Sequence, residues 1–134
     1  MKIILFVCVH NAGRSQMAEA FLNHFAKERG LAIRAESAGT LVGTILNPLA
    51  VAVMQEIGID MTGQVPKLLT QDMANAATQI ITMGCGVDAE ACPARFMISE
   101  DWGLDDPAGQ PIDMVRRIRD EIRERVEVLL KAEQ

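Results

Sequence analysis

The chain has 134 residues, of which 49% are hydrophobic, and it carries a formal net charge of −5. This length and composition predict one folded domain over residues 1–134 and exclude a disordered chain. The acidic balance argues against nucleic acid as the main partner, and the first apolar run is too short to cross a membrane. Because the N-terminus lacks a signal-peptide pattern, we expect a cytoplasmic protein, with three cysteines that serve redox or catalytic chemistry rather than a disulfide framework.

Apolar runs typical of strands alternate along the chain with segments of helical periodicity. In chain order, the expected elements are a strand at 2–7, a helix at 15–29, a strand at 31–37, helices at 48–57 and 71–76, strands at 79–83 and 96–98, and a helix at 112–131. Gly30 is suited to cap the first helix, and Pro48 takes the first position of the second. The pattern predicts an α/β fold with three layers, α/β/α, around a central four-stranded parallel sheet.

The last expected helix is amphipathic. Its apolar stripe consists of Ile112, Val115, Ile118, Ile122, Val126 and Leu129. The charged residues expected mostly on its solvent-exposed face are Arg116, Arg117, Arg119, Asp120, Glu121, Arg123 and Glu124. Because acids are interleaved with the arginines, a solvated face is favoured over an RNA-binding surface.

A cysteine and an arginine bracket the turn between the first expected strand and the first expected helix. The first N–H groups of a helix have no intrahelical partner and carry partial positive charge, so they attract anions. Arg14 adds a planar charged fork that suits two oxygens of a tetrahedral anion, and this field favours the thiolate of Cys8. The residues expected to hold the anion are Val9, His10, Asn11, Ala12, Gly13, Arg14 and Ser15. The alternative, an inert buried Cys8 with Arg14 in a surface pair, explains neither the position of the motif nor its small residues.

The residues from Cys8 to Glu19 resemble the anion loop shared by low-molecular-weight protein tyrosine phosphatases and thioredoxin-coupled arsenate reductases. The resemblance implies that Cys8 is a nucleophile, that Arg14 binds the anion and that Ser15 stabilises the thiolate. It further implies that the loop is supported by Asn11, Glu19 and Ser37, with the serine bonded to the asparagine. Asparagine tolerates the left-handed backbone that such a loop needs.

Some arsenate reductases of this type hold a potassium ion on residues that match those three supporting positions. Lys67, in the loop expected at 60–69, brings an ammonium group that could take the place of such an ion. The alternative is an ordinary solvated surface lysine.

Cys85 and Cys92 form a C-x6-C-P pattern after the third expected strand. They are either two unrelated cysteines or a redox pair. A zinc site is disfavoured because the spacing of the cysteines and histidines matches no common ligand set. We therefore expect no metal and no cofactor. The resemblance favours the redox pair, because the arsenate reductases carry two cysteines at this place and the phosphatases generally do not. It implies that Cys85 attacks the sulfur of Cys8, that Cys92 then attacks Cys85, and that thioredoxin or another thiol donor reduces the final disulfide.

Asp106 precedes Pro107 in a polar loop near the end of the chain. Chemistry at the anion expels an oxygen, which leaves more easily when a nearby acid protonates it. In both resembled families the aspartate before the proline has this role, whereas Asp105 is interpreted as a solvated neighbour. The phosphatases typically follow this proline with tyrosines, but this chain has no tyrosine, so its open rim suits a small inorganic anion.

The sequence therefore favours a monomeric arsenate reductase, with phosphate or sulfate as substrate analogues. The first alternative is a low-molecular-weight protein tyrosine phosphatase that uses Cys8, Arg14 and Asp106, with water resolving a cysteinyl phosphate. The second is a non-catalytic anion or redox sensor in which Cys85 and Cys92 form a reversible switch.

Overall fold

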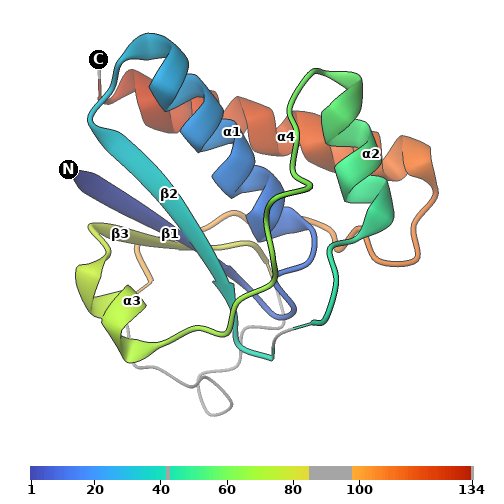
Figure 1. Cartoon of the computed structure of the whole chain (residues 1–134), viewed down its shortest axis with the longest axis horizontal. Helices are drawn as coiled ribbons and strands as arrows, with labels where there is room; N and C mark the ends of the chain where they lie inside the picture. Colours follow the sequence, from blue (N-terminus) through green and yellow to red (C-terminus); the bar gives the residue numbers. More distant parts are fainter. Residues whose placement is uncertain (42, 85–97, 134) are drawn as a thin grey trace.

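The computed structural model describes residues 1–41, 43–84 and 98–133 (Figure 1). Its elements are β1 (Lys2–Cys8), α1 (Arg14–Arg29), β2 (Ile33–Gly39), α2 (Pro48–Glu56), α3 (Gln71–Ala76), β3 (Gln79–Thr82), β4 (Glu100–Asp101) and α4 (Ile112–Lys131). The four strands form one sheet in the order β2-β1-β3-β4, and every neighbouring pair is parallel. The predicted α/β/α fold is thus confirmed.

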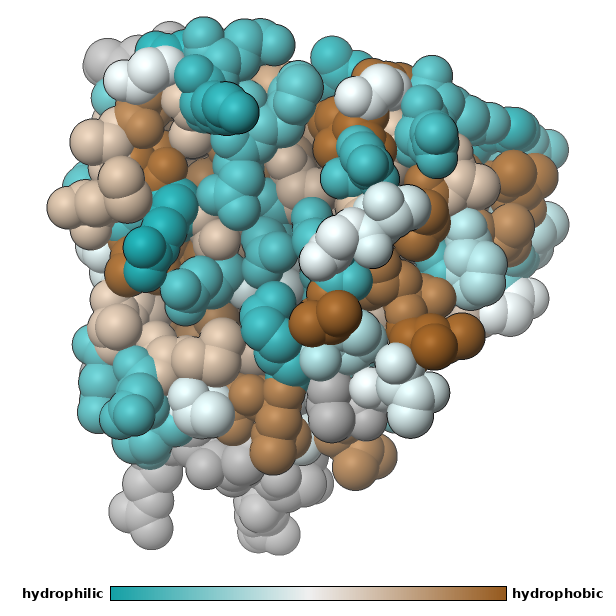
Figure 2. Space-filling model, in the orientation of Figure 1, coloured by the Kyte–Doolittle hydropathy of each residue, from teal (hydrophilic) through white to brown (hydrophobic). Residues whose placement is uncertain are grey.

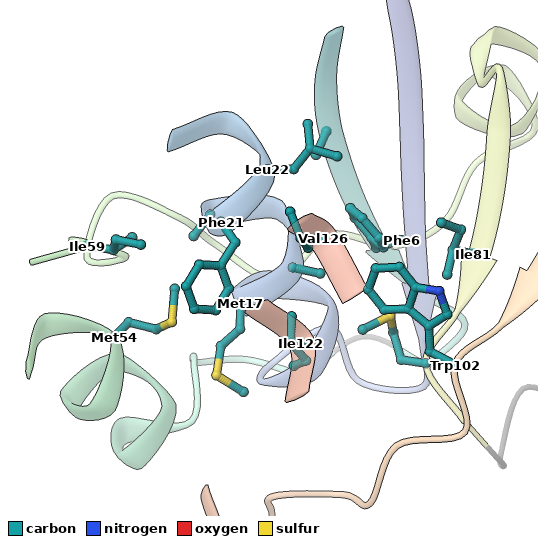
Figure 3. Packing of buried hydrophobic residues seen from close by; sticks show 14 of the residues in the cluster. Phe6, Met17, Phe21, Leu22, Met54, Ile59, Ile81, Trp102, Ile122 and Val126 are labelled. Carbon is teal, nitrogen blue, oxygen red and sulfur yellow. The ribbon is translucent and has the colours of Figure 1, made fainter. Parts of the chain in front are cut away.

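The alternation of side chains along β1 separates two apolar layers, because successive residues of a strand point to opposite faces of the sheet. Ile4 and Phe6 belong to the larger core, which they share with α1, α2 and α4. Leu5 and Val7 belong to the smaller cluster on the face that carries α3. Figure 3 shows the larger core, in which the ring of Trp102 lies 5.3 Å from that of Phe6, measured between centroids. This packing fixes the carboxyl end of β1, where Cys8 lies.

The helix ends follow the sequence signals closely. Gly30 caps α1 in the left-handed conformation, with φ 65°. Asn47 caps α2 with its side-chain oxygen, which accepts hydrogen bonds from the N–H groups of Leu49 and Ala50, and Pro48 takes the first helical position as predicted. The cap of α2 matters for the site because Asn47 also lines the pocket described below.

The fourth strand of the sheet lies later in the chain than the sequence predicted. Ile98 lies outside any strand, and residues 96 and 97 lie outside the described residues. The strand beside β3 is instead formed by Glu100 and Asp101, which pair with Ile81 and Thr82. The apolar run suggested a buried strand, but register in this sheet is decided by the ladder with β3, and an exposed edge strand accepts acidic side chains.

The expectation that Arg119 faces solvent is also wrong, since this residue is only 9% exposed. Its guanidinium lies between α4 and α2, where Nη1 donates to the carbonyl of Val53 at 2.9 Å and to Glu56 Oε1 at 3.0 Å. The long apolar stem of arginine can be buried along a helix contact while its head stays paired.

Figure 2 shows hydrophilic residues over much of the face seen in Figure 1, with smaller hydrophobic groups between them. Exposed large apolar side chains include Leu41, Ile45 and Val65, which belong to the loops between β2 and α3. In the part of the chain that the structure describes, no helix is long and apolar enough to cross a membrane.

Candidate active site

A small pocket lies where β1 passes into α1. Its volume is about 50 Å³, and its lining consists of Cys8, His10, Ala12, Gly13, Arg14, Asn47, Asp106, Pro107 and Ala108. Cys8 is 4% exposed, so its sulfur is largely shielded from solvent. The pocket brings together the two ends of the predicted anion loop and the predicted acid, although Asp106 is about 100 residues from Cys8 in the sequence.

The backbone of the loop at 9–13 has its carbonyl groups turned away from the pocket. The carbonyls of Val9, His10 and Ala12 accept hydrogen bonds from the N–H groups of Leu41, Gly43 and Asn47, at 2.8 to 2.9 Å. Across a trans peptide unit the N–H points opposite to the C=O. The N–H groups that follow these carbonyls are therefore directed inward, and such a ring of N–H groups binds anions. Gly39 permits the close approach of β2, since a Cβ there would lie 2.5 Å from the carbonyl oxygen of Val9.

Two donors converge on the sulfur of Cys8. The N–H of Asn11 donates to Sγ at 3.2 Å, and Ser15 Oγ lies 2.8 Å from the same sulfur. Ser15 Oγ also accepts a hydrogen bond from Asn11 Nδ2 at 2.8 Å, which directs the hydroxyl proton toward the sulfur. Both donors are thus aimed at the sulfur, the atom that faces the pocket.

The amide orientation of Asn11 is fixed by a backbone donor. The N–H of Lys67 donates to Asn11 Oδ1 at 2.8 Å, so the other amide atom must be the nitrogen that reaches Ser15. Among the described residues, Asn11 is the non-glycine residue with positive φ, at 54°. Asn11 therefore has the left-handed conformation that the sequence predicted for it.

The predicted hydrogen bond between Ser37 and Asn11 is not the one that the structure has. Ser37 Oγ donates to Glu19 Oε1 at 2.9 Å, and the oxygen of Asn11 is taken by Lys67 and Gln16. The ammonium of Lys67 lies 3.4 Å from the same Glu19 oxygen. Lys67 is therefore placed at the supporting residues rather than free on the surface.

Sequence reasoning missed Gln16, which is fully buried. Its Nε2 donates to the backbone and side-chain oxygens of Asn11 and to the carbonyl of Val65, at 2.9 to 3.1 Å. Gln64 in turn donates to the side-chain oxygen of Gln16 at 2.6 Å. The small and apolar residues that follow Gln16 in α1 could have indicated its burial. A helix that is buried on nearly all sides also buries the polar side chains of its first turn.

Arg14 joins the anion loop to the far side of the pocket. Its Nη1 donates to the carbonyl oxygens of Met83 and Leu104, both at 3.0 Å, and its Nη2 lies 3.8 Å from Asp106 Oδ2. The side chain of Asp106 is 55% exposed, and Oδ1 accepts a hydrogen bond from the N–H of Ala108. Gly13 contacts Pro107, since a Cβ there would lie 2.8 Å from the proline ring. The loop that carries Asp106 and Pro107 is thus packed directly on the anion loop.

Cys85 and Cys92 lie outside the described residues, so the structure does not place them. Gly84, directly before Cys85, is described, and it lies next to Arg14. Among the residues that the structure describes, no group of three His, Cys, Asp or Glu side chains could hold a metal ion.

Comparison with known proteins gives a consistent result. The family described as low molecular weight phosphotyrosine protein phosphatase matches residues 3–134. The glutaredoxin arsenate reductase of Synechocystis sp. is 38% identical over 131 residues, which cover 97% of each chain. The structure of an arsenate reductase in the phosphate binding state has a TM-score of 0.84 and 36% identity, with full coverage of both chains. The thioredoxin-dependent arsenate reductase of Corynebacterium glutamicum has a TM-score of 0.78 and 36% identity, over 98% of this chain and 61% of that one.

Proposed function

Because this chain belongs to the low molecular weight phosphotyrosine protein phosphatase family and aligns with arsenate reductases along almost its whole length, we propose that it reduces arsenate to arsenite. The observation that carries the proposal is the pocket itself. Its volume of about 50 Å³ suits a single tetrahedral oxyanion, and Cys8 and Arg14 both line it. Phosphate and sulfate have the same shape and bind as analogues.

Arsenate binds to the inward N–H groups of the loop at 9–15 and to the guanidinium of Arg14. The thiolate of Cys8, held by Ser15 and the N–H of Asn11, attacks arsenic and forms an S–As bond. The As–O bond opposite breaks, and the oxygen leaves as water after it takes the proton of Asp106. This aspartate lies within 3.8 Å of Arg14, so it can reach an oxygen of the bound anion.

Reduction needs a second thiol. Cys85 attacks the sulfur of Cys8, the S–As bond breaks, and its electron pair stays on arsenic, which leaves as arsenite. Cys92 then attacks Cys85, which frees Cys8 and leaves a Cys85–Cys92 disulfide. Support for these two steps comes from the C-x6-C-P sequence pattern and from the family resemblance.

A protein or low-molecular-weight thiol donor reduces the final disulfide. The relatives named above include one called a glutaredoxin arsenate reductase and one called thioredoxin-dependent, so both donor systems are candidates for this chain. The cycle requires free thiols, which are kept reduced in the cytoplasm. We place the enzyme there, acting as a monomer with residues 1–134 as one functional unit.

Lys67 supports the anion loop in place of a potassium ion. Its ammonium lies 3.4 Å from Glu19 Oε1, and its backbone N–H holds Asn11 Oδ1. Glu19 is 9% exposed, and an almost buried carboxylate needs a cationic or hydrogen-bonding partner. Lys67 and Ser37 provide both.

The test is coupled turnover with arsenate. Wild-type protein is supplied with NADPH and with one of two donor systems. The first is thioredoxin with thioredoxin reductase, and the second is glutaredoxin with glutathione and glutathione reductase. We expect arsenate-dependent NADPH consumption with at least one donor system, and none with Cys8→Ser. No consumption with either system, together with steady hydrolysis of an aryl phosphate that Cys8→Ser abolishes, would establish the phosphatase alternative instead.

A further inference from the structure

Asp101, the last residue of β4, bridges the ends of two strands through one oxygen atom. Its Oδ1 accepts a hydrogen bond from Thr82 Oγ1 at 2.6 Å and another from the N–H of Gly84 at 3.0 Å. Thr82 ends β3, and Asp101 is its ladder partner in β4. The carboxylate therefore holds the chain just where it leaves the sheet.

The N–H of Gly84 belongs to the same peptide unit as the carbonyl of Met83. That carbonyl accepts a hydrogen bond from Arg14 Nη1 at 3.0 Å. A trans peptide unit is planar, and its N–H and C=O point in opposite directions. A hydrogen bond that fixes the direction of the N–H therefore also fixes the direction of the C=O. The Met83–Gly84 peptide thus links the Asp101 carboxylate to the Arg14 guanidinium, and the charges at its two ends strengthen both hydrogen bonds.

Gly84 is the residue that allows this close packing. Its φ is +127°, which side-chain-bearing residues rarely adopt, and a Cβ there would lie 2.7 Å from the carbonyl oxygen of Leu104 and 3.0 Å from Arg14 Nη1. The peptide is therefore packed tightly against the guanidinium, and a change in its orientation is transmitted to Arg14.

We propose that Asp101 is a positioning residue for Arg14. It orients the Met83–Gly84 peptide so that the carbonyl oxygens of Met83 and Leu104 both accept hydrogen bonds from Arg14 Nη1. The other terminal nitrogen, Nη2, then remains at the pocket, where it lies 3.8 Å from Asp106 Oδ2. The inference rests on the proposed function, in which Arg14 binds the oxyanion. It adds a residue that does not line the pocket and has no contact with the anion loop among the described interactions.

The experiment measures binding of inorganic phosphate to the fully reduced protein by calorimetry, beside KM and kcat for arsenate. Asp101→Ala removes the acceptor, and we expect phosphate affinity to fall about tenfold, the effect of one displaced charge-assisted hydrogen bond. KM for arsenate should rise by a similar factor, with a smaller change in kcat. Asp101→Asn keeps an acceptor oxygen for both donors and should restore affinity to within about threefold of wild type.

The matched control is Glu100→Ala. Glu100 precedes Asp101 in β4, but its side chain lines a separate pocket between this strand and α4, with Trp102 and Arg125. We expect its phosphate affinity and KM to equal those of wild type. Thermal unfolding of all variants shows whether any loss of affinity follows from loss of the fold.

A double-mutant cycle tests whether the effect passes through Arg14. Lysine at position 14 lacks the fork that reaches the Met83 carbonyl, so Asp101→Ala should weaken phosphate binding less than twofold in the Arg14→Lys background. Additive effects, or wild-type affinity in Asp101→Ala alone, would overturn the inference. If wild-type protein neither binds phosphate nor reduces arsenate, the proposed function itself fails, and the positioning role fails with it.

Discussion

Ser15 Oγ lies 2.8 Å from Cys8 Sγ, and the same oxygen accepts a hydrogen bond from Asn11 Nδ2. The serine proton is therefore directed to the sulfur, although Ser15 is seven positions along the chain from Cys8 and belongs to the first turn of α1. The sulfur at the end of β1 thus receives a hydroxyl donor from α1 and a backbone donor from the loop between them.

Substitution of Ser15 by alanine removes the hydroxyl donor. A hydrogen bond to a charged group contributes about 1.5–3 kcal/mol, so the arsenate-dependent loss of thiols in a single turnover should slow about ten- to a hundredfold. Ser15→Thr keeps the hydroxyl and is expected to retain most of the rate. Stopped-flow thiol counting distinguishes the variants, and a wild-type rate in Ser15→Ala would refute the role of this contact.

Asp106→Asn removes the proton that the leaving oxygen takes. General acid catalysis contributes about 10²–10⁴ in rate, so arsenite release should slow by that factor while phosphate binding is retained. The matched control is Asp105→Asn, a change in the exposed neighbouring carboxylate, which should leave the rate close to wild type. If Asp106→Asn released arsenite at the wild-type rate, Asp106 would not be the general acid.

Lys67→Ala leaves Glu19 without its ammonium partner, which in the structure lies 3.4 Å away. We expect potassium chloride to raise the melting temperature of this variant more than choline chloride of equal ionic strength does, because potassium can occupy the vacated position. Wild-type protein should respond equally to both salts. A potassium-specific increase in wild type would mean that the ion binds in addition to Lys67, rather than in its place.

Glu56, at the end of α2, gives a pH-dependent contribution to stability. The hydrogen bond from Arg116 lowers the pKa of its carboxyl below the ordinary value of 4.5, and Arg119 acts in the same direction. A lowered folded-state pKa contributes stability above the unfolded value, and this is lost as the pH falls through the folded value.

Glu56→Gln should therefore destabilise the protein at pH 7, and its difference from wild type should shrink as the pH falls below about 4. Urea unfolding at several pH values measures this difference. Glu124→Gln makes the same change of charge at an exposed position of α4 and should show a smaller difference at pH 7. A pH-independent difference between Glu56→Gln and wild type would contradict the assignment.

The anion loop was predictable from the sequence because its parts are local. The strand, the loop at 9–13 and the helix N-terminus are consecutive, and the left-handed conformation of Asn11 follows from its residue type. The cap at Gly30 and the place of Pro48 at the start of α2 were predictable for the same reason.

What the sequence could not give depends on contacts between distant segments. The side-chain oxygen of Asn11 already accepts hydrogen bonds from Lys67 and Gln16. The hydroxyl of Ser37 therefore donates to Glu19 instead. The burial of Arg119 likewise depends on where α2 ends. The bridge from Asp101 to Gly84 required the register of β4, which the apolar run at 96–98 misplaced.

The central claim is that Cys8 attacks arsenic and that a second thiol of the same chain completes the reduction. The most direct test is a single turnover without a donor: the protein is reduced, the reductant is removed, arsenate is added, and arsenite and free thiols are counted. The account predicts about one arsenite per chain and the loss of two of the three thiols, with the disulfide mapped by mass spectrometry. No arsenite with three intact thiols would contradict it.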